Sequence, residues 1–428
     1  MEASTQRTAT GAVTRASALR KPLSKDVLGK VHEFPLLNRN TENMSYNIHQ
    51  QVFVLSNASN LLSACKGTQA DLQGKIDAAL QPSITNAKIG DWGVVWGPKV
   101  WKFNPGNANS GPDRVWYIAH NPSANFGDGG HDTYVLAVAG TADSSFENLV
   151  IDAYVNKVVD FNDWVQTGIT TAPEQATSVD QAKPYIAYGT ATGISILLTV
   201  ASPAGQTIIE FLSTIPSTSR LVFTGHSLGG ALSPSVALAL LKAGLLKNAP
   251  GNVFAYPTAG PSPGNGPFAA LFSREFPLTT EGPAPYQVWN GNLTNAYDIV
   301  PHAWGIDTLN EIPTLYGELP FIPAVLVKAI INGAIDKAKS SGLGYVSLQG
   351  QTFSAATPTT PKTLKVFLQT ALQEHISAYG VLLGTPSIPS LCKPASSTEQ
   401  ARGLPILGGI YQAHLEAKEM ERMEKEAE

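Results

Sequence analysis

The sequence contains few cysteines and no long hydrophobic run, and each shortage excludes a kind of protein. Cys65 and Cys392 are the only cysteines among 428 residues, which leaves neither a disulfide framework nor a cysteine-based metal site. The two suffice for a single bridge, and the sequence does not decide whether it forms. The longest apolar runs, at 194–201 and 321–331, are shorter than the roughly 18 residues needed to span a bilayer, so we expect no transmembrane segment.

Charged residues are also scarce, and the two signs nearly balance. Lys and Arg total 29, Asp and Glu total 33, and charged residues form 14% of the chain. Because no basic stripe is visible, we expect no nucleic-acid partner. The first 30 residues contain no apolar stretch of the secretory type. The compartment therefore stays open, with an intracellular location slightly favoured over a secreted one.

Composition along the chain predicts three regions. Residues 1–45 are polar and aperiodic, which is typical of a flexible arm. Residues 46–395 are expected to form the folded domain, and 396–428 a charged helical tail with Glu and Lys interleaved. Within the domain, the less regular segment 305–361 is interpreted as an insertion or cap.

Alternating strand and helix patterns within the domain indicate an α/β fold. Helices are expected at 60–80, 146–165, 180–200, 231–243, 267–276 and 362–375. Strands are expected at 115–119, 134–139, 221–224, 252–256 and 286–289, with a hairpin at 92–103. Several of these strands are apolar throughout, which is typical of a mostly parallel sheet with helices on both faces.

The stretch GHSLGG at 225–230 has the G-x-S-x-G pattern, between a buried-strand pattern and a helical one. A sharp strand-to-helix turn raises the serine hydroxyl above the sheet, and flanking glycines remove the Cβ atoms that would clash. The start of the helix favours developing negative charge, so the N–H of Leu228 would face the carbonyl oxygen under attack. The pattern predicts that Ser227 is a nucleophile, and that His226 packs rather than serving as its base.

A nucleophilic serine needs a base, and the base needs an acid to orient it. In this kind of fold both follow the serine, with the acid first. The candidates after Ser227 are Asp298, Asp307, Asp336, His302, His375 and His414. Asp298 lies in a loop after the strand expected at 286–289, where such sheets place their active groups. His302 is too close to Asp298 along the chain, and His414 lies in the charged tail. We therefore expect Asp298 as the acid and His375 as the base. The alternative acids are Glu374 and Glu311.

Five stretches of the sequence occur in an order that points to a known family. They are YVLAVAGTAD, FTGHSLGGAL, YPTAGPSPGNGPFA, NAYDIVPH and EHISAYG. Together they resemble the class 3 (fungal-type) triacylglycerol lipases of the α/β-hydrolase fold, over about residues 115–385. The resemblance implies the triad of Ser227, Asp298 and His375. It also implies that Thr141 and Leu228 form the oxyanion hole.

The same resemblance implies a helical lid around 142–165, where apolar residues recur near helical spacing. An ordinary amphipathic helix packed on the sheet is the alternative. The implied activity is hydrolysis of carboxylic esters, with acylglycerol lipids favoured as substrate, through an acyl-enzyme. No metal or organic cofactor is expected, and the expected partners are the substrate and a transient lipid interface. Two alternatives stay open, namely an esterase for soluble short-chain or aromatic esters and a hydrolase-fold protein that binds lipid without catalysis.

Overall fold

The computed structural model describes residues 45–142 and 154–393. The flexible arm predicted for 1–45, apart from Ser45, and the helical tail predicted for 396–428 lie outside these residues. So does 143–153, which is part of the lid predicted around 142–165.

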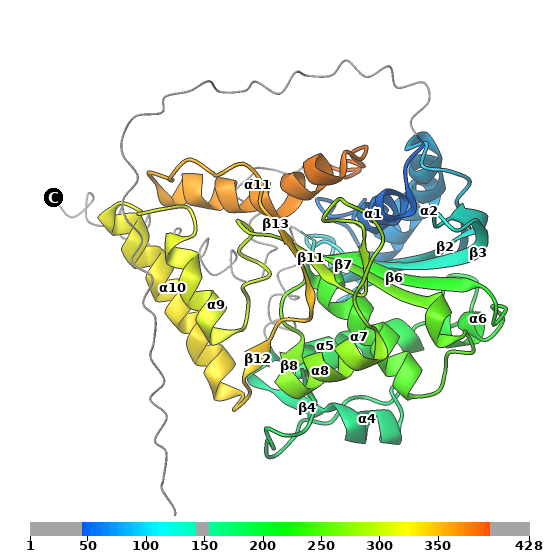
Figure 1. The fold of residues 1–428 in the computed structure, drawn as a ribbon, viewed down its shortest axis with the longest axis horizontal. Coiled ribbons are helices and arrows are strands. Elements are labelled where there is room, and N and C mark those ends of the chain that lie inside the picture. Colours follow the sequence, from blue (N-terminus) through cyan, green and yellow to red (C-terminus); the bar gives the residue numbers. More distant parts are fainter. Residues whose placement is uncertain (1–44, 143–153, 394–428) are drawn as a thin grey trace, which may run out of the picture. The chain divides into compact units, whose positions relative to one another are not determined.

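A mixed seven-stranded sheet organises the fold, in the order β1-β2-β3-β6-β7-β11-β13 (Figure 1). Its strands are β1 (Gly93–Trp101), β2 (Arg114–Asn125), β3 (Gly130–Val138), β6 (Arg220–His226), β7 (Val253–Thr258), β11 (Asn292–Asn295) and β13 (Gly350–Phe353). From β3 to β13 neighbouring strands run parallel, whereas β1, β2 and β3 pair antiparallel. The predicted α/β class with a mostly parallel sheet is confirmed.

Side chains that alternate along β2 pack into two different cores. Val115 and Tyr117 face the core beneath α1 (Ile48–Ala58), α2 (Gln69–Asn86) and α11 (Leu364–Leu383). Trp116 faces the opposite core, which contains α5 (Tyr188–Thr199), α7 (Leu228–Lys242) and α8 (Gly266–Glu275). Figure 1 shows these two sets of helices on the two faces of the sheet. Burial on both faces explains why the parallel strands are apolar throughout.

Helix α7 is apolar nearly all round because it has neighbours on every side. Its residues from Leu228 to Leu240 are buried, and the helix contacts β6, β7, α5 and α8. An amphipathic pattern would be expected only for a helix with one face in water. The strand β6 and helix α7 therefore form a rigid strand-turn-helix unit in the middle of the molecule.

The segment 305–361 is more regular than the sequence indicates. It contains α9 (Ile306–Glu311) and the 20-residue helix α10 (Phe321–Ser340), which build a third core with the first half of α11. It ends in β13, an edge strand of the central sheet. Among the described residues, no helix combines the length and apolarity needed to cross a membrane.

Two local predictions about the strands are wrong. The hairpin expected at 92–103 is the single strand β1, which pairs with β2 and has register shifts around its cis Gly97-Pro98 bond. The strand expected at 286–289 is the short β10 (Val288–Trp289), which pairs with β9 (Thr279–Thr280) outside the central sheet. The sheet strand that precedes Asp298 is instead β11, whose polar sequence Asn-Leu-Thr-Asn hides it in the loop.

Three helix predictions also need correction. The helix expected at 180–200 begins only at Tyr188, after the short strand β5 (Tyr185–Ala187). The helix expected at 60–80 begins only at Gln69, where Thr68 and Asp71 form a capping box, and residues 59–64 form turns. The described part of 146–165 contains a 3₁₀ turn at Tyr154–Asn156, the strand β4 (Val158–Asp160) and the start of α4 (Phe161–Thr167). Phe161 is fully buried in the core of α5 and α7. This part of the predicted lid is therefore packed against the body of the fold.

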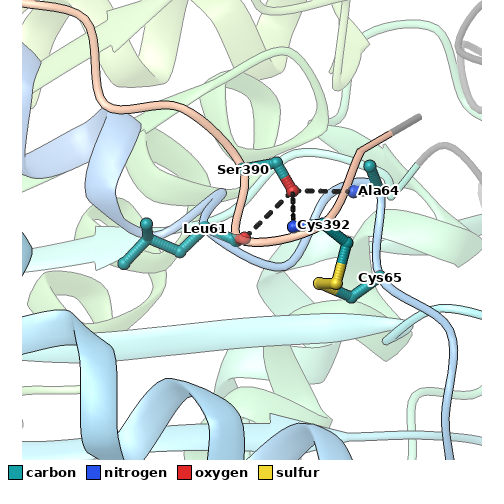
Figure 2. Close-up of a disulfide and its surroundings, with 5 residues drawn as sticks. All are labelled: Leu61, Ala64, Cys65, Ser390 and Cys392. Atoms are coloured by element: carbon teal, nitrogen blue, oxygen red, sulfur yellow. Dashed lines mark hydrogen bonds between the residues drawn. A yellow bond between two sulfur atoms is a disulfide. The ribbon is translucent and has the colours of Figure 1, made fainter.

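Cys65 and Cys392 form a disulfide, which answers the question that the sequence leaves open (Figure 2). The bridge joins residues 327 positions apart. Beside it, the Ser390 hydroxyl donates to the carbonyl of Leu61 at 3.1 Å and accepts from the N–H of Ala64 at 3.2 Å. The chain that follows α11 is thereby fastened to the turn between α1 and α2.

Candidate active site

Ser227 occupies a strained turn between β6 and α7. Its φ of 61° and ψ of −125° are rarely adopted by a residue with a side chain, at a cost of about 1–3 kcal/mol. The Ser227 N–H donates to the carbonyl of Thr258 on β7 at 3.0 Å, which holds the turn over the sheet. A Cβ on Gly225 would overlap the carbonyl oxygen of Gly229, and one on Gly229 would overlap that of Val138. The two glycines are therefore required by close backbone approach.

Asp298 and His375 form a buried pair. Nδ1 of His375 lies 2.8 Å from Oδ2 and 3.0 Å from Oδ1 of Asp298, and the carboxylate is 0% exposed. The Tyr379 hydroxyl donates to Oδ2 at 2.8 Å, and the Val300 N–H donates to Oδ1 at 2.9 Å. Because an ionised carboxylate only accepts hydrogen bonds, Nδ1 of His375 carries the proton. Its Nε2 then has the free lone pair that a base needs.

The structure brings Ser227 into the neighbourhood of this pair. His226, the residue before Ser227, donates from Nε2 to the backbone carbonyl of His375 at 2.9 Å, and the two rings are 4.7 Å apart. The Ser227 hydroxyl and His375 Nε2 are both buried, and neither makes a hydrogen bond in this structure. Unpaired buried polar atoms are rare in native proteins and call for an explanation. In enzymes without substrate, hydrogen bonds of catalytic groups are often long or poorly aligned.

His226 is held as a neutral, fully packed ring. Since its Nε2 donates to a carbonyl, its Nδ1 accepts from the Thr258 hydroxyl at 2.8 Å. Burial, followed by the nearby His375, lowers the pKa of His226 well below its usual value. The ring therefore connects β7 to α11 and is not available as a base for Ser227.

Thr141 and Leu228 lie on the two segments that flank Ser227. Thr141 is buried and follows the end of β3 by three residues. The preceding residue, Gly140, is so close to the turn that an added Cβ would lie 3.2 Å from Ser227 Cβ. Leu228 is the first residue of α7, so its N–H has no acceptor within the helix. The site thus brings together the hydroxyl of Ser227, the imidazole of His375 and the backbone segments of Thr141 and Leu228.

The other candidate residues make their contacts elsewhere. His302 lies 2.8 Å from the backbone carbonyl of Asp298 through Nδ1, and its Nε2 lies 3.4 Å from Glu311. Glu374 accepts from the side-chain amide of Asn295 at 2.7 Å, and burial raises its pKa. Within residues 45–142 and 154–393, no group of three or more His, Cys, Asp or Glu side chains is placed to hold a metal ion.

Two residues of the site were not predicted from the sequence. Tyr379 lies one helical turn after His375 on α11, and that spacing within EHISAYG is the signal that could have found it. Asn60 accepts the N–H of Gly140 at 2.9 Å from a position 80 residues earlier, and no local pattern indicates this contact.

The central sheet and its covering helices have the α/β-hydrolase fold. The model of the class 3 lipase family, "Lipase (class 3)", matches residues 139–308, which include Ser227 and Asp298. Over this segment the chain is similar to the class 3 lipase family, which the sequence motifs also resemble. The match ends before His375 and begins after Asn60.

The solved structure of one lipase, M37 lipase, shares the fold of this chain. M37 lipase aligns over 87% of this chain and 100% of its own, with 22% identity and a TM-score of 0.57. The lipase of Rhizopus microsporus var. chinensis aligns over 66% of this chain and 79% of its own, with 16% identity and a TM-score of 0.33. Lipase II from Rhizopus niveus aligns over 59% and 74%, with 18% identity and a TM-score of 0.32. A search of curated proteins finds no match.

Proposed function

We propose that the protein hydrolyses lipid esters through an acyl-enzyme on Ser227, with His375 as the base and Asp298 as the acid. The observation that carries this proposal is that Ser227 Oγ and His375 Nε2 are both buried and unpartnered, while the neighbouring His226 bonds to the backbone of His375. A buried polar atom without a hydrogen bond costs free energy, and a pairing of the Ser227 nucleophile with the His375 base during the reaction accounts for both atoms.

In the first step, Nε2 of His375 takes the proton of the Ser227 hydroxyl as Oγ attacks the ester carbonyl. The carbonyl electrons move to oxygen, and the N–H groups of Thr141 and Leu228 bind the resulting anion. Asp298 stabilises the imidazolium, held by Tyr379 and Val300. Collapse of the intermediate expels the alcohol, which receives the proton from His375. Water then cleaves the acyl-enzyme by the same route.

Acylglycerols are the favoured substrates because of the family match at 139–308. The fold and the triad by themselves also suit soluble short-chain and aromatic esters. A hydrolase-fold protein that only binds lipid would need no strained serine turn and no oriented imidazole. The test must therefore first distinguish catalysis from lipid binding without catalysis. It must then distinguish lipid esters from soluble esters.

The test measures hydrolysis of p-nitrophenyl esters of increasing chain length by the wild-type protein, Ser227→Ala and Ser233→Ala. Ser233 is a matched control because it lies on α7, is fully buried and also has an unpartnered hydroxyl. We expect Ser227→Ala to lose activity by about 10⁴-fold or more, and Ser233→Ala to keep it.

The chain-length profile decides the substrate class. A rate that rises with chain length and increases when the ester forms an emulsion supports a lipid substrate. A maximum at short chains without that increase favours the soluble-ester alternative. If the wild-type protein neither hydrolyses any ester nor reacts with a fluorophosphonate probe, the proposal is wrong and lipid binding is favoured.

A further inference from the structure

Asn60 reaches the active site from the turn after α1. Its Oδ1 accepts the N–H of Gly140 at 2.9 Å. A Cβ added to Gly140 would lie 3.5 Å from that Oδ1 and 3.2 Å from Ser227 Cβ. The side-chain amide of Asn60 therefore lies in the immediate surroundings of the proposed nucleophile, although it comes from a part of the chain outside the family match.

The peptide unit that Asn60 holds joins Ala139 to Gly140, and the next unit carries the N–H of Thr141. The pairing of β3 with β2 and β6 ends at Val138, and the Ala139 N–H still donates to the carbonyl of Val115 at 2.9 Å. Beyond that point the chain leaves the sheet, and the bond to Asn60 holds Gly140. Only the φ and ψ of Gly140 separate this planar unit from the N–H of Thr141, so holding the unit in place limits where that N–H can lie.

The turn that carries Asn60 is itself well anchored (Figure 2). Leu61 accepts from the Ser390 hydroxyl at 3.1 Å, and the Cys65–Cys392 disulfide closes the same turn. These contacts join it to the chain that follows α11. Because the turn is held in place, Asn60 can restrain the backbone at Gly140. A mobile turn would not restrain it.

We propose that Asn60 is a positioning residue for ester hydrolysis, whose side-chain carbonyl orients Gly140 and Thr141 so that the Thr141 N–H faces the developing oxyanion. This inference rests on the proposed function. It makes a specific chemical demand, since the group at position 60 must accept a hydrogen bond and must be uncharged. An aspartate would keep the acceptor but would place negative charge beside an anion that forms in the transition state.

The test compares Asn60→Ala and Asn60→Asp with the control Asn57→Ala, which changes a half-buried asparagine at the end of α1, just before the same turn. Each protein is assayed on a p-nitrophenyl ester across the pH range. Active sites are counted by complete fluorophosphonate labelling, and thermal unfolding reports the folded fraction. We expect Asn60→Ala to lower kcat about 10-fold with KM changed less than about 2-fold. We expect the Asn57→Ala variant to match the wild type.

The Asn60→Asp variant separates positioning from mere folding. Relative to the wild type, its kcat should fall by about 10-fold or more as the new carboxyl ionises, because only the ionised form opposes the oxyanion. A constant ratio across the pH range would overturn the inference, as would a kcat for Asn60→Ala within about 2-fold of wild type or an equal loss in Asn57→Ala. If the wild-type protein itself is inactive, the proposed function fails and this inference fails with it.

Discussion

Replacing Tyr379 by phenylalanine removes one oxygen atom from the centre of the site. The hydroxyl donates to Asp298 Oδ2 at 2.8 Å and accepts the N–H of Asn295 at 3.0 Å. The ring lies 5.0 Å from that of His226 and 5.3 Å from that of Phe353. Since phenylalanine keeps these ring contacts, the substitution leaves only a small void and isolates the effect of the two hydrogen bonds.

Both lost bonds lie in a fully buried environment. A hydrogen bond to a charged group contributes about 1.5–3 kcal/mol, and an orphaned buried N–H costs about 1–3 kcal/mol. We therefore expect Tyr379→Phe to lower the free energy of unfolding by about 3 kcal/mol. Activity should fall less than about 10-fold, because Val300 and His375 still hold Asp298.

The assay is urea unfolding at neutral pH together with ester hydrolysis, with Tyr316→Phe as the control. Tyr316 is also buried, but its hydroxyl donates to the backbone carbonyl of Tyr297 at 2.9 Å rather than to a side chain of the proposed triad. The control should lose about 1 kcal/mol of stability and no activity. A loss below about 1 kcal/mol for Tyr379→Phe would refute the assigned bonds to Asp298 and Asn295.

Two further predictions concern stability. Burial lowers the pKa of His49 from 6.5 to about 3. Below pH 6.5 the unfolded chain therefore binds a proton at this histidine that the folded chain does not bind, and the free energy of unfolding falls as the pH drops. The His49→Phe variant keeps a ring against Trp289 but has no group to titrate. Between pH 7 and pH 5 its free energy of unfolding should therefore fall by about 2 kcal/mol less than that of the wild type. An equal fall in both proteins would contradict this. Replacing both Cys65 and Cys392 by serine should lower the free energy of unfolding by about 5 kcal/mol, because the bridge closes a loop of 327 positions. An unchanged urea midpoint would contradict this.

Local sequence patterns located those parts of the site that depend on local structure. The strand-turn-helix unit around Ser227 follows from an apolar run, close-packed glycines and a helical pattern, all within about 20 residues. Asp298 and His375 could be predicted as the acid and the base because few aspartates and histidines follow Ser227 in the sequence. The strand β11 was missed because its residues are mostly polar, and side-chain pattern is the main signal for a strand.

The remaining parts depend on contacts between distant segments. The bond from Asn60 to Gly140 spans 80 residues and the disulfide spans 327, and neither leaves a periodic trace in the sequence. The contact of Tyr379 with Asp298 spans 81 residues and becomes visible only when α11 is placed on the sheet. The supports of the proposed triad are therefore properties of the fold, whereas its nucleophile is a property of one short stretch.

The most direct test of the account is fluorophosphonate labelling of the folded protein, with the modified residue identified by mass spectrometry of its peptides. We predict a single adduct on Ser227, no adduct in Ser227→Ala, and labelling slowed by several orders of magnitude in His375→Ala. Labelling of another serine, or equally fast labelling without the imidazole of His375, would contradict it.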